Sequence, residues 1–189
     1  AEDATFGGYY DAHIGVECSG VVTRVGAKVT ALQPGAHVVA LARGSFGSYV
    51  VAPETCVYPS PAGLSDVDAA ALPMAYLTAY YGLVEAGRLE AGQRVLIHAA
   101  TGGVGLAAIH IAKRLGATVY ATAGREHKRE YLRSLGVEHV YDSRSLAFVH
   151  EIRKQVGGQG VDLILNSLSG ELMAGSLALL GRRGRFVEI

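Results

Sequence analysis

A glycine-rich turn is the stretch of this sequence whose residue types and spacing point most directly to chemistry. Residues 95–105 read VLIHAATGGVG; residues 95–97 predict a short buried strand, and residues 106–115 predict a helix. A strand, a glycine turn and a helix form the first unit of a dinucleotide-binding fold. Gly102 and Gly103 would let backbone N–H groups approach a pyrophosphate at the helix N-terminus. The alternative is a tight turn without a ligand.

The residues after the second predicted strand, 118–122, bear on the choice of nucleotide. NAD-binding folds place an acid at that strand end, about 20 residues beyond the glycines, to hold the ribose hydroxyls. This sequence has no acid there, and Arg125 and Lys128 follow instead. Guanidinium and ammonium groups suit a 2′-phosphate, so we infer NADP(H). The alternative is a pair of solvated charges, although cations at a helix start oppose its dipole by up to ~1 kcal/mol.

The second half of the chain alternates between predicted strands and predicted helices. Further strands are predicted at residues 139–141, 161–165 and 185–189, and further helices at 126–135, 146–156 and 168–180. Such alternation is typical of a parallel, doubly wound α/β sheet with helices on both faces. The elements that must position the glycine turn are therefore expected to form a Rossmann-type fold.

The first half of the chain has a different pattern. Residues 14–25, 38–42 and 48–52 are strand candidates separated by glycine and proline, which favours a small irregular β domain. Ser65 is a candidate N-cap for a helix over 66–72, which Pro73 interrupts. A second helix is predicted over 74–86, ended by Gly87.

Composition narrows the classes of partner. The 189 residues are 50% hydrophobic and 18% charged, with a formal net charge of +0. A balanced charge gives no indication of a nucleic-acid partner or a membrane surface, and no apolar run approaches the ~20 residues that span a bilayer. No signal peptide opens the sequence, and two cysteines suit a reducing compartment. We expect a cytoplasmic location and a piece excised from a longer polypeptide.

Six segments occurring together in order carry a family resemblance. They are IGVECSGVV (14–22), LPMAYLTAYY (72–81), IHAATGGVG (97–105), DSRS (142–145), GVDLILNSL (160–168) and GRFVEI (184–189). The set closely resembles the enoyl reductase domain of type I polyketide synthases and animal-type fatty acid synthases, zinc-free members of the medium-chain dehydrogenase/reductase superfamily. The resemblance implies a partial GroES-like β domain over residues 1–72. It implies an NADP-binding Rossmann domain over 73–189, truncated at its C-terminal end.

The resemblance also implies an activity. It is the NADPH-dependent reduction of a trans-2-enoyl thioester on acyl carrier protein, with hydride added to the β carbon and a proton to the α carbon. Neighbouring synthase domains would be partners, and a homodimer is compatible with the resemblance. Two alternatives stay open: a stand-alone NADPH quinone oxidoreductase, and a non-catalytic NADPH-binding or scaffold fragment.

The resemblance assigns cofactor-binding residues position by position. The pyrophosphate would lie on Thr101, Gly102, Gly103 and Val104; the 2′-phosphate would lie among Arg125, Lys128 and Arg144, with Ser143 nearby; the nicotinamide half would lie along Thr78, Asn166, Ser167 and Leu168. Thr78 is equally well interpreted as a helix-interior hydroxyl bonded to its own backbone. Asn166 is equally well interpreted as an ordinary strand-end turn residue.

Departures from the family pattern leave the catalytic residues unassigned. Val16 stands where zinc-dependent relatives carry a histidine ligand, and so few cysteines remain that no zinc site is expected. Glu17 is then expected to be a structural, hydrogen-bonded acid, and His98 a satisfied strand histidine. The family's motif continues beyond Ile189 to a lysine proposed to act on the substrate. Tyr9 and Tyr10 lie near the place of a family tyrosine, but loop packing is the preferred interpretation.

Overall fold

The computed structural model describes residues 14–189 of the chain. The molecule divides into two compact units, with the boundary between Met74 and Ala75. Each unit has its own sheet, so each is described by itself.

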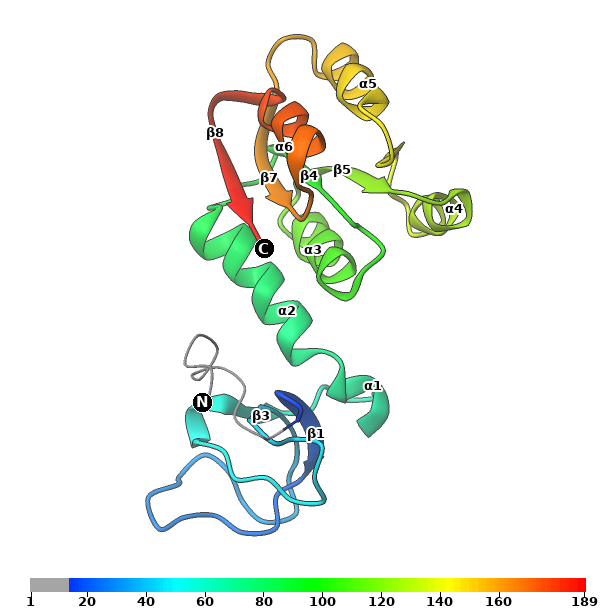
Figure 1. Cartoon of the computed structure of the whole chain (residues 1–189). Helices are drawn as coiled ribbons and strands as arrows, with labels where there is room; N and C mark the ends of the chain where they lie inside the picture. The colour runs from blue at the N-terminus through cyan, green and yellow to red at the C-terminus, as the bar shows by residue number, and fades with distance from the viewer. Residues whose placement is uncertain (1–13) are drawn as a thin grey trace, which may run out of the picture. The chain divides into compact units, whose positions relative to one another are not determined.

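The second unit is built on a five-stranded sheet in which every neighbouring pair is parallel. The strands are β4 (Arg94–Ile97), β5 (Thr118–Ala123), β6 (His139–Asp142), β7 (Val161–Asn166) and β8 (Leu180–Glu188). Their order across the sheet is β6-β5-β4-β7-β8, and Figure 1 shows them in the upper part of the ribbon. The structure thus confirms the α/β fold class that the alternating pattern predicts.

Both faces of this sheet are apolar, and helices cover both. Side chains alternate along a strand, so Val95 and Ile97 of β4 belong to one buried cluster and Leu96 to the other. The first cluster includes side chains of η2 (Tyr81–Ala86), α3 (Gly103–Arg114) and α4 (Glu126–Ser134). The second includes side chains of α5 (Ala147–Val156), with Leu172 of α6 (Gly170–Leu177) packed against it. Two apolar faces covered by helices make the sheet doubly wound.

The first unit contains a three-stranded antiparallel sheet. Its strands are β1 (Glu17–Val21), β2 (His37–Leu41) and β3 (Val57–Pro59), with the short helix η1 (Glu54–Cys56) leading into β3. The strand expected at 48–52 is wrong, because that segment has no regular structure and pairs with no strand of the described chain. Tyr49 and Val51 are 79% and 96% exposed, so the described part of this unit leaves most of the segment uncovered. The short β3, which ends in proline, escaped prediction.

The helices that lie between the two sheets in the sequence follow their sequence signals closely, whereas the helix predicted over 168–180 is too long: α6 ends at Leu177, and β8 already begins at Leu180. Ser65 caps α1 (Asp66–Ala70), since its Oγ accepts the backbone N–H of Asp68 at 3.2 Å. Pro73 occupies the first position of α2 (Pro73–Tyr80), where its missing N–H costs nothing. The chain then continues through the π-helical turn η2 to Gly87. A β carbon at Gly87 would lie 2.5 Å from the carbonyl oxygen of Gly82, so the end of this helix requires glycine.

Candidate functional site

The glycine turn lies at the point where the strand order of the parallel sheet reverses. The chain leaves β4 through α3 and returns as β5 on one side, whereas β7 pairs with β4 on the other side. Open α/β sheets bind ligands in the crevice outside the carboxyl ends of the strands at such a point. The topology therefore puts the turn where a ligand site is expected.

The geometry of the turn leaves the N-terminus of α3 without a side-chain cap. Gly102 is the N-cap residue, with extended backbone angles and no side-chain hydrogen bond to the helix. Gly102 and Gly103 are exposed, while Thr101 and Val104 are half-buried. The first N–H groups of a helix have no partner within it, and they carry its positive dipole end. The arrangement can bind an anion such as a phosphate.

The three glycines of the turn differ in what a side chain would meet. A β carbon at Gly105 would lie 2.6 Å from the Cα of Ala100, so Gly105 allows α3 to pack closely on the strand end. At Gly103 the β carbon would meet only the β carbon of Ala75, at an ordinary 3.6 Å. The protein itself thus has no steric need for glycine at 103. The sequence interpretation missed the packing role of Gly105, although its third place in the glycine pattern is a signal for it.

Three cationic residues follow the carboxyl ends of β5 and β6, on the same sheet edge as the glycine turn. We call Arg125, Lys128 and Arg144 the cation cluster; all three residues are exposed. The strand ends are paired at Ala123 and Asp142, and a β carbon at Gly124 would lie 3.2 Å from Arg144 Nε and 3.4 Å from the Oγ of Ser143. Two segments about 20 residues apart thus lie side by side at this edge of the sheet.

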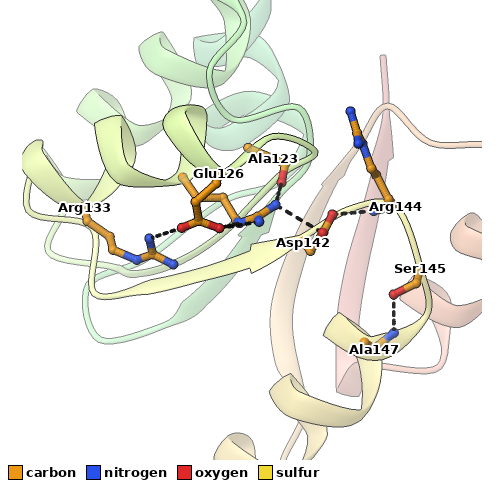
Figure 2. Close-up of polar contacts among 8 residues, drawn as sticks. Ala123, Glu126, Arg133, Asp142, Arg144, Ser145 and Ala147 are labelled. Atoms are coloured by element: carbon orange, nitrogen blue, oxygen red, sulfur yellow. Dashed lines mark hydrogen bonds and ion pairs between the residues drawn. The ribbon is translucent and has the colours of Figure 1, made fainter.

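A network of ion pairs joins the two segments that carry the cation cluster. Arg129 of α4 pairs with Glu126 and, at 3.2 Å, with Asp142 at the end of β6. Figure 2 shows the carboxylates of Glu126 and Asp142 with the carbonyl of Ala123 and the guanidinium of Arg133. Hydrogen bonds from Arg133 and then from Arg129 lower the pKa of Glu126. Sequence reasoning missed this network; the Glu126–Arg129 spacing of three residues on a helix is its visible signal.

A buried histidine joins the ends of β4 and β7. His98 is 3% exposed, and its Nδ1 lies 2.9 Å from Oδ1 of Asn166. Its Nε2 lies 3.2 Å from Oγ of Ser176 in α6. Burial lowers the pKa of His98 to about 4, against the opposing effect of its hydrogen bond to Asn166. The structure confirms that His98 is a satisfied histidine.

The Asn166 side chain makes its hydrogen bonds inside the protein. It is fully buried, its Oδ1 accepts the N–H of Leu168 at 3.2 Å, and its Nδ2 donates to the Leu168 carbonyl at 2.8 Å. These bonds fold the turn after β7 and leave Ser167 exposed, while Leu168 packs against the second buried cluster. Thr78 is half-buried on α2.

The first unit holds the remaining residues of interest. Glu17 accepts the backbone N–H of Met74 at 2.8 Å, in the first turn of α2, which confirms its expected structural role. Tyr9 and Tyr10 lie outside the described residues. Within residues 14–189, no three His, Cys, Asp or Glu side chains gather closely enough to hold a metal ion; that this protein has no zinc site stays a prediction. None of the described helices is both long and apolar enough to cross a membrane.

Comparison with known families places each half of the chain. Residues 3–62 match the family described as "Alcohol dehydrogenase GroES-like domain". Residues 103–189 match the family described as "Zinc-binding dehydrogenase". The two matches follow the order of the β-rich and α/β units.

Individual relatives are parts of large synthases. The chain is 45% identical over 191 residues to a mycocerosic acid synthase-like polyketide synthase of Mycobacterium tuberculosis, covering 98% of this chain and 9% of that protein. It is 49% identical over 180 residues to erythronolide synthase EryA2 of Saccharopolyspora erythraea, covering 94% of this chain and 5% of that protein. The chain therefore corresponds to a small part of each synthase.

Solved structures of similar fold include enoyl reductases. The CurK enoyl reductase is 45% identical with a TM-score of 0.87, over 93% of this chain and 53% of that one. Mycobacterial Rv1454c, solved in complex with NADPH, is 31% identical with a TM-score of 0.82, over 91% and 55%. The chain thus spans about half the length of these solved relatives.

Proposed function

This chain belongs to the family of enoyl reductase domains of polyketide synthases, within the alcohol dehydrogenase-like oxidoreductases, and from that premise we propose that it serves NADPH-dependent enoyl reduction. The substrate is a trans-2-enoyl thioester carried on acyl carrier protein. Hydride is added to the β carbon and a proton to the α carbon. The neighbouring domains of a synthase are its partners.

The observation that carries this proposal is the pairing of two anion-binding features on one sheet edge. The uncapped N-terminus of α3 suits the pyrophosphate of a dinucleotide. The cation cluster at the ends of β5 and β6 suits the additional phosphate that distinguishes NADPH from NADH. The exposed Gly103 fits close approach by a ligand, because a β carbon there would meet only Ala75, at an ordinary contact distance.

Each part of the site has a stated task under this proposal. Thr101 to Val104 hold the pyrophosphate, while the cation cluster and Ser143 hold the 2′-phosphate. The nicotinamide half lies along Thr78 and the turn of residues 166–168. Asn166 acts there by folding the turn, since its side-chain atoms bond to His98 and Leu168, and the exposed Ser167 faces outward.

The protein must also meet the demands of the reaction at the thioester. When bound, the cofactor supplies the hydride. Negative charge develops on the thioester oxygen, so the protein must stabilise that oxygen and deliver a proton to the α carbon. His98 is not assigned to that step, because its ring nitrogens bond inside the protein. No described residue is proposed as the proton donor.

The experiment that tests the proposal has a binding arm and a turnover arm. Fluorescence titration should show NADPH binding at least tenfold tighter than NADH. Turnover should consume NADPH with a short trans-2-enoyl thioester and not with a quinone. Reduction of the quinone alone would favour a stand-alone quinone oxidoreductase. Binding without turnover of either would favour a non-catalytic nucleotide-binding module, and no binding at millimolar NADPH in a folded chain would overturn the proposal.

A further inference from the structure

The Arg129 side chain joins three elements in the segments that carry the cation cluster. Its side chain is only 14% exposed. Its Nε donates to Glu126 at 3.1 Å, and one terminal nitrogen donates to the Ala123 carbonyl at 3.0 Å. That same nitrogen lies 3.2 Å from the Oδ2 of Asp142. The guanidinium thus joins the end of β5, the first turn of α4 and the end of β6.

Asp142 is held at both of its oxygens. Oδ2 faces Arg129, while Oδ1 accepts the backbone N–H of Arg144 at 2.9 Å. The second bond shapes the turn that presents Ser143 and Arg144 beside Gly124. The Arg144 side chain itself extends away from the Asp142 carboxylate (Figure 2). Asp142 therefore positions Arg144 through the backbone and leaves its guanidinium unpaired by this carboxylate.

The carboxylates of Glu126 and Asp142 would oppose the binding of a phosphate if their charges were not paired. Glu126 and Asp142 are 56% and 44% exposed at their side chains, and they lie within the segments that carry the cation cluster. Without a partner, each would repel a phosphate dianion or pair with one of the cluster cations. Arg133 also pairs with Glu126, at 2.9 Å, but Asp142 has its ion pair with Arg129.

We infer that Arg129 is a positioning residue for recognition of an adenosine 2′-phosphate: it engages the carboxylates of Glu126 and Asp142 and so leaves the cation cluster for the ligand. This inference rests on the proposed use of NADPH. It adds a residue that touches no part of the ligand and acts through its neighbours. Its effect should be specific to the 2′-phosphate, because the carboxylates that it engages lie beside that group.

The test measures the binding of ligands that contain only the adenosine end of the dinucleotide. Calorimetric titration compares 2′,5′-ADP with 5′-AMP. The dissociation constant of 5′-AMP divided by that of 2′,5′-ADP reports the preference for the 2′-phosphate. R129M should reduce that ratio roughly tenfold, the usual value of one charge-assisted contact. The double variant R129M/D142N should recover most of the ratio, because asparagine removes the unpaired charge and keeps an oxygen for the Arg144 N–H.

R133M is the matched control. It removes an equal charge from the same helix and one of the ion pairs of Glu126. The ion pair between Arg129 and Asp142 is kept. Its ratio should stay within about twofold of the unchanged protein. If R129M does not fold by circular dichroism, R129K replaces it. Lysine keeps the charge but lacks the fork that reaches several acceptors, so an intermediate ratio is expected.

The outcomes separate this inference from the proposed function. An equal loss of affinity for both ligands in R129M means that Arg129 only stabilises the fold, and the inference is overturned. An unchanged protein that does not prefer 2′,5′-ADP over 5′-AMP overturns both the NADPH proposal and the inference. A ratio that falls in R129M, in a protein that reduces no enoyl thioester, upholds the inference and rejects the reaction.

Discussion

At the scale of single residues, side chains near the glycine turn divide into those held inside the protein and those left free. His98 and Asn166 are buried and bonded to each other. Lys128 and Arg144 are exposed at the strand ends. Free cations can respond to a ligand, whereas the buried pair can only shape the turn.

Lys128→Glu should weaken NADPH binding far more than NADH binding. The change places a negative charge against the 2′-phosphate, which costs roughly a hundredfold in affinity. Fluorescence titration of both cofactors measures the effect. Lys154→Glu makes the same charge change on an exposed residue in the last turn of α5 and should leave both affinities unchanged. Equal losses for the two cofactors would remove Lys128 from the specificity role.

His98 should make the chain less stable in mild acid. In the unfolded chain its imidazole binds a proton near the ordinary histidine pKa of 6.5, whereas in the folded chain burial lowers that pKa to about 4. The contribution of His98 to the free energy of unfolding is therefore complete above pH 6.5. It is lost as the pH falls toward 4, which lowers that free energy by about 3 kcal/mol in total. Urea unfolding at several pH values should show this slope, and His98→Gln should flatten it. His150→Gln, at an exposed position, should keep the full slope.

At the scale of elements, the junction of β4 and α3 combines close packing with an open end. Gly105 lies against the backbone of Ala100, while a β carbon at the exposed Gly103 would make only an ordinary contact with Ala75. The same residue type thus serves stability at one position and is proposed to serve binding at the other. A methyl group at each position separates the two uses.

Gly105→Ala should destabilise the protein by about 2 to 3 kcal/mol, because the added carbon meets backbone that cannot move aside. Gly103→Ala should leave the stability equal or up to about 1 kcal/mol higher, and should reduce NADPH affinity roughly tenfold. Denaturant unfolding and NADPH titration of both variants give the comparison. A destabilised Gly103→Ala variant that binds NADPH normally would contradict the assignment of that glycine.

At the scale of the whole molecule, the two units differ in how completely they are filled. The second unit has two large buried clusters on the faces of its sheet. The first unit has a hollow of about 690 Å³ beside its strands, lined by residues such as Cys18, Val38 and Val57. Buried packing sets the free energy of local opening, so the two sheets should not be equally protected.

Hydrogen exchange should separate the two sheets. Amides of β4, whose residues 95–97 are fully buried, should exchange roughly a hundredfold more slowly than those of β2 (His37–Leu41). Mass spectrometry of peptides covering the two strands measures the difference. Equal protection would mean that the units open together, in conflict with their separate packing.

Much of the second unit could be predicted from local patterns alone. Short stretches of sequence predict the strand, the glycine turn and the helix, because hydrophobic periodicity and glycine affect the conformation of neighbouring residues. The predicted ranges for β5 and α4 therefore differ from the observed ones by one residue. The segment 48–52 has the same β-like composition as real strands, yet it finds no partner strand among residues 14–189, and a strand needs one.

The sequence by itself determined the fold class, the family and the position of the glycine turn. Only the tertiary structure decided which side chains are free to bind. His98 hydrogen-bonds to Asn166 and Ser176, which lie 68 and 78 residues further along the chain. Arg129 of α4 pairs with Asp142 at the end of β6. Such contacts depend on how strands are ordered in the sheet, and no local pattern encodes that order. The glycine turn could be found by its spacing, but the partners of the charges beside it could be found only in three dimensions.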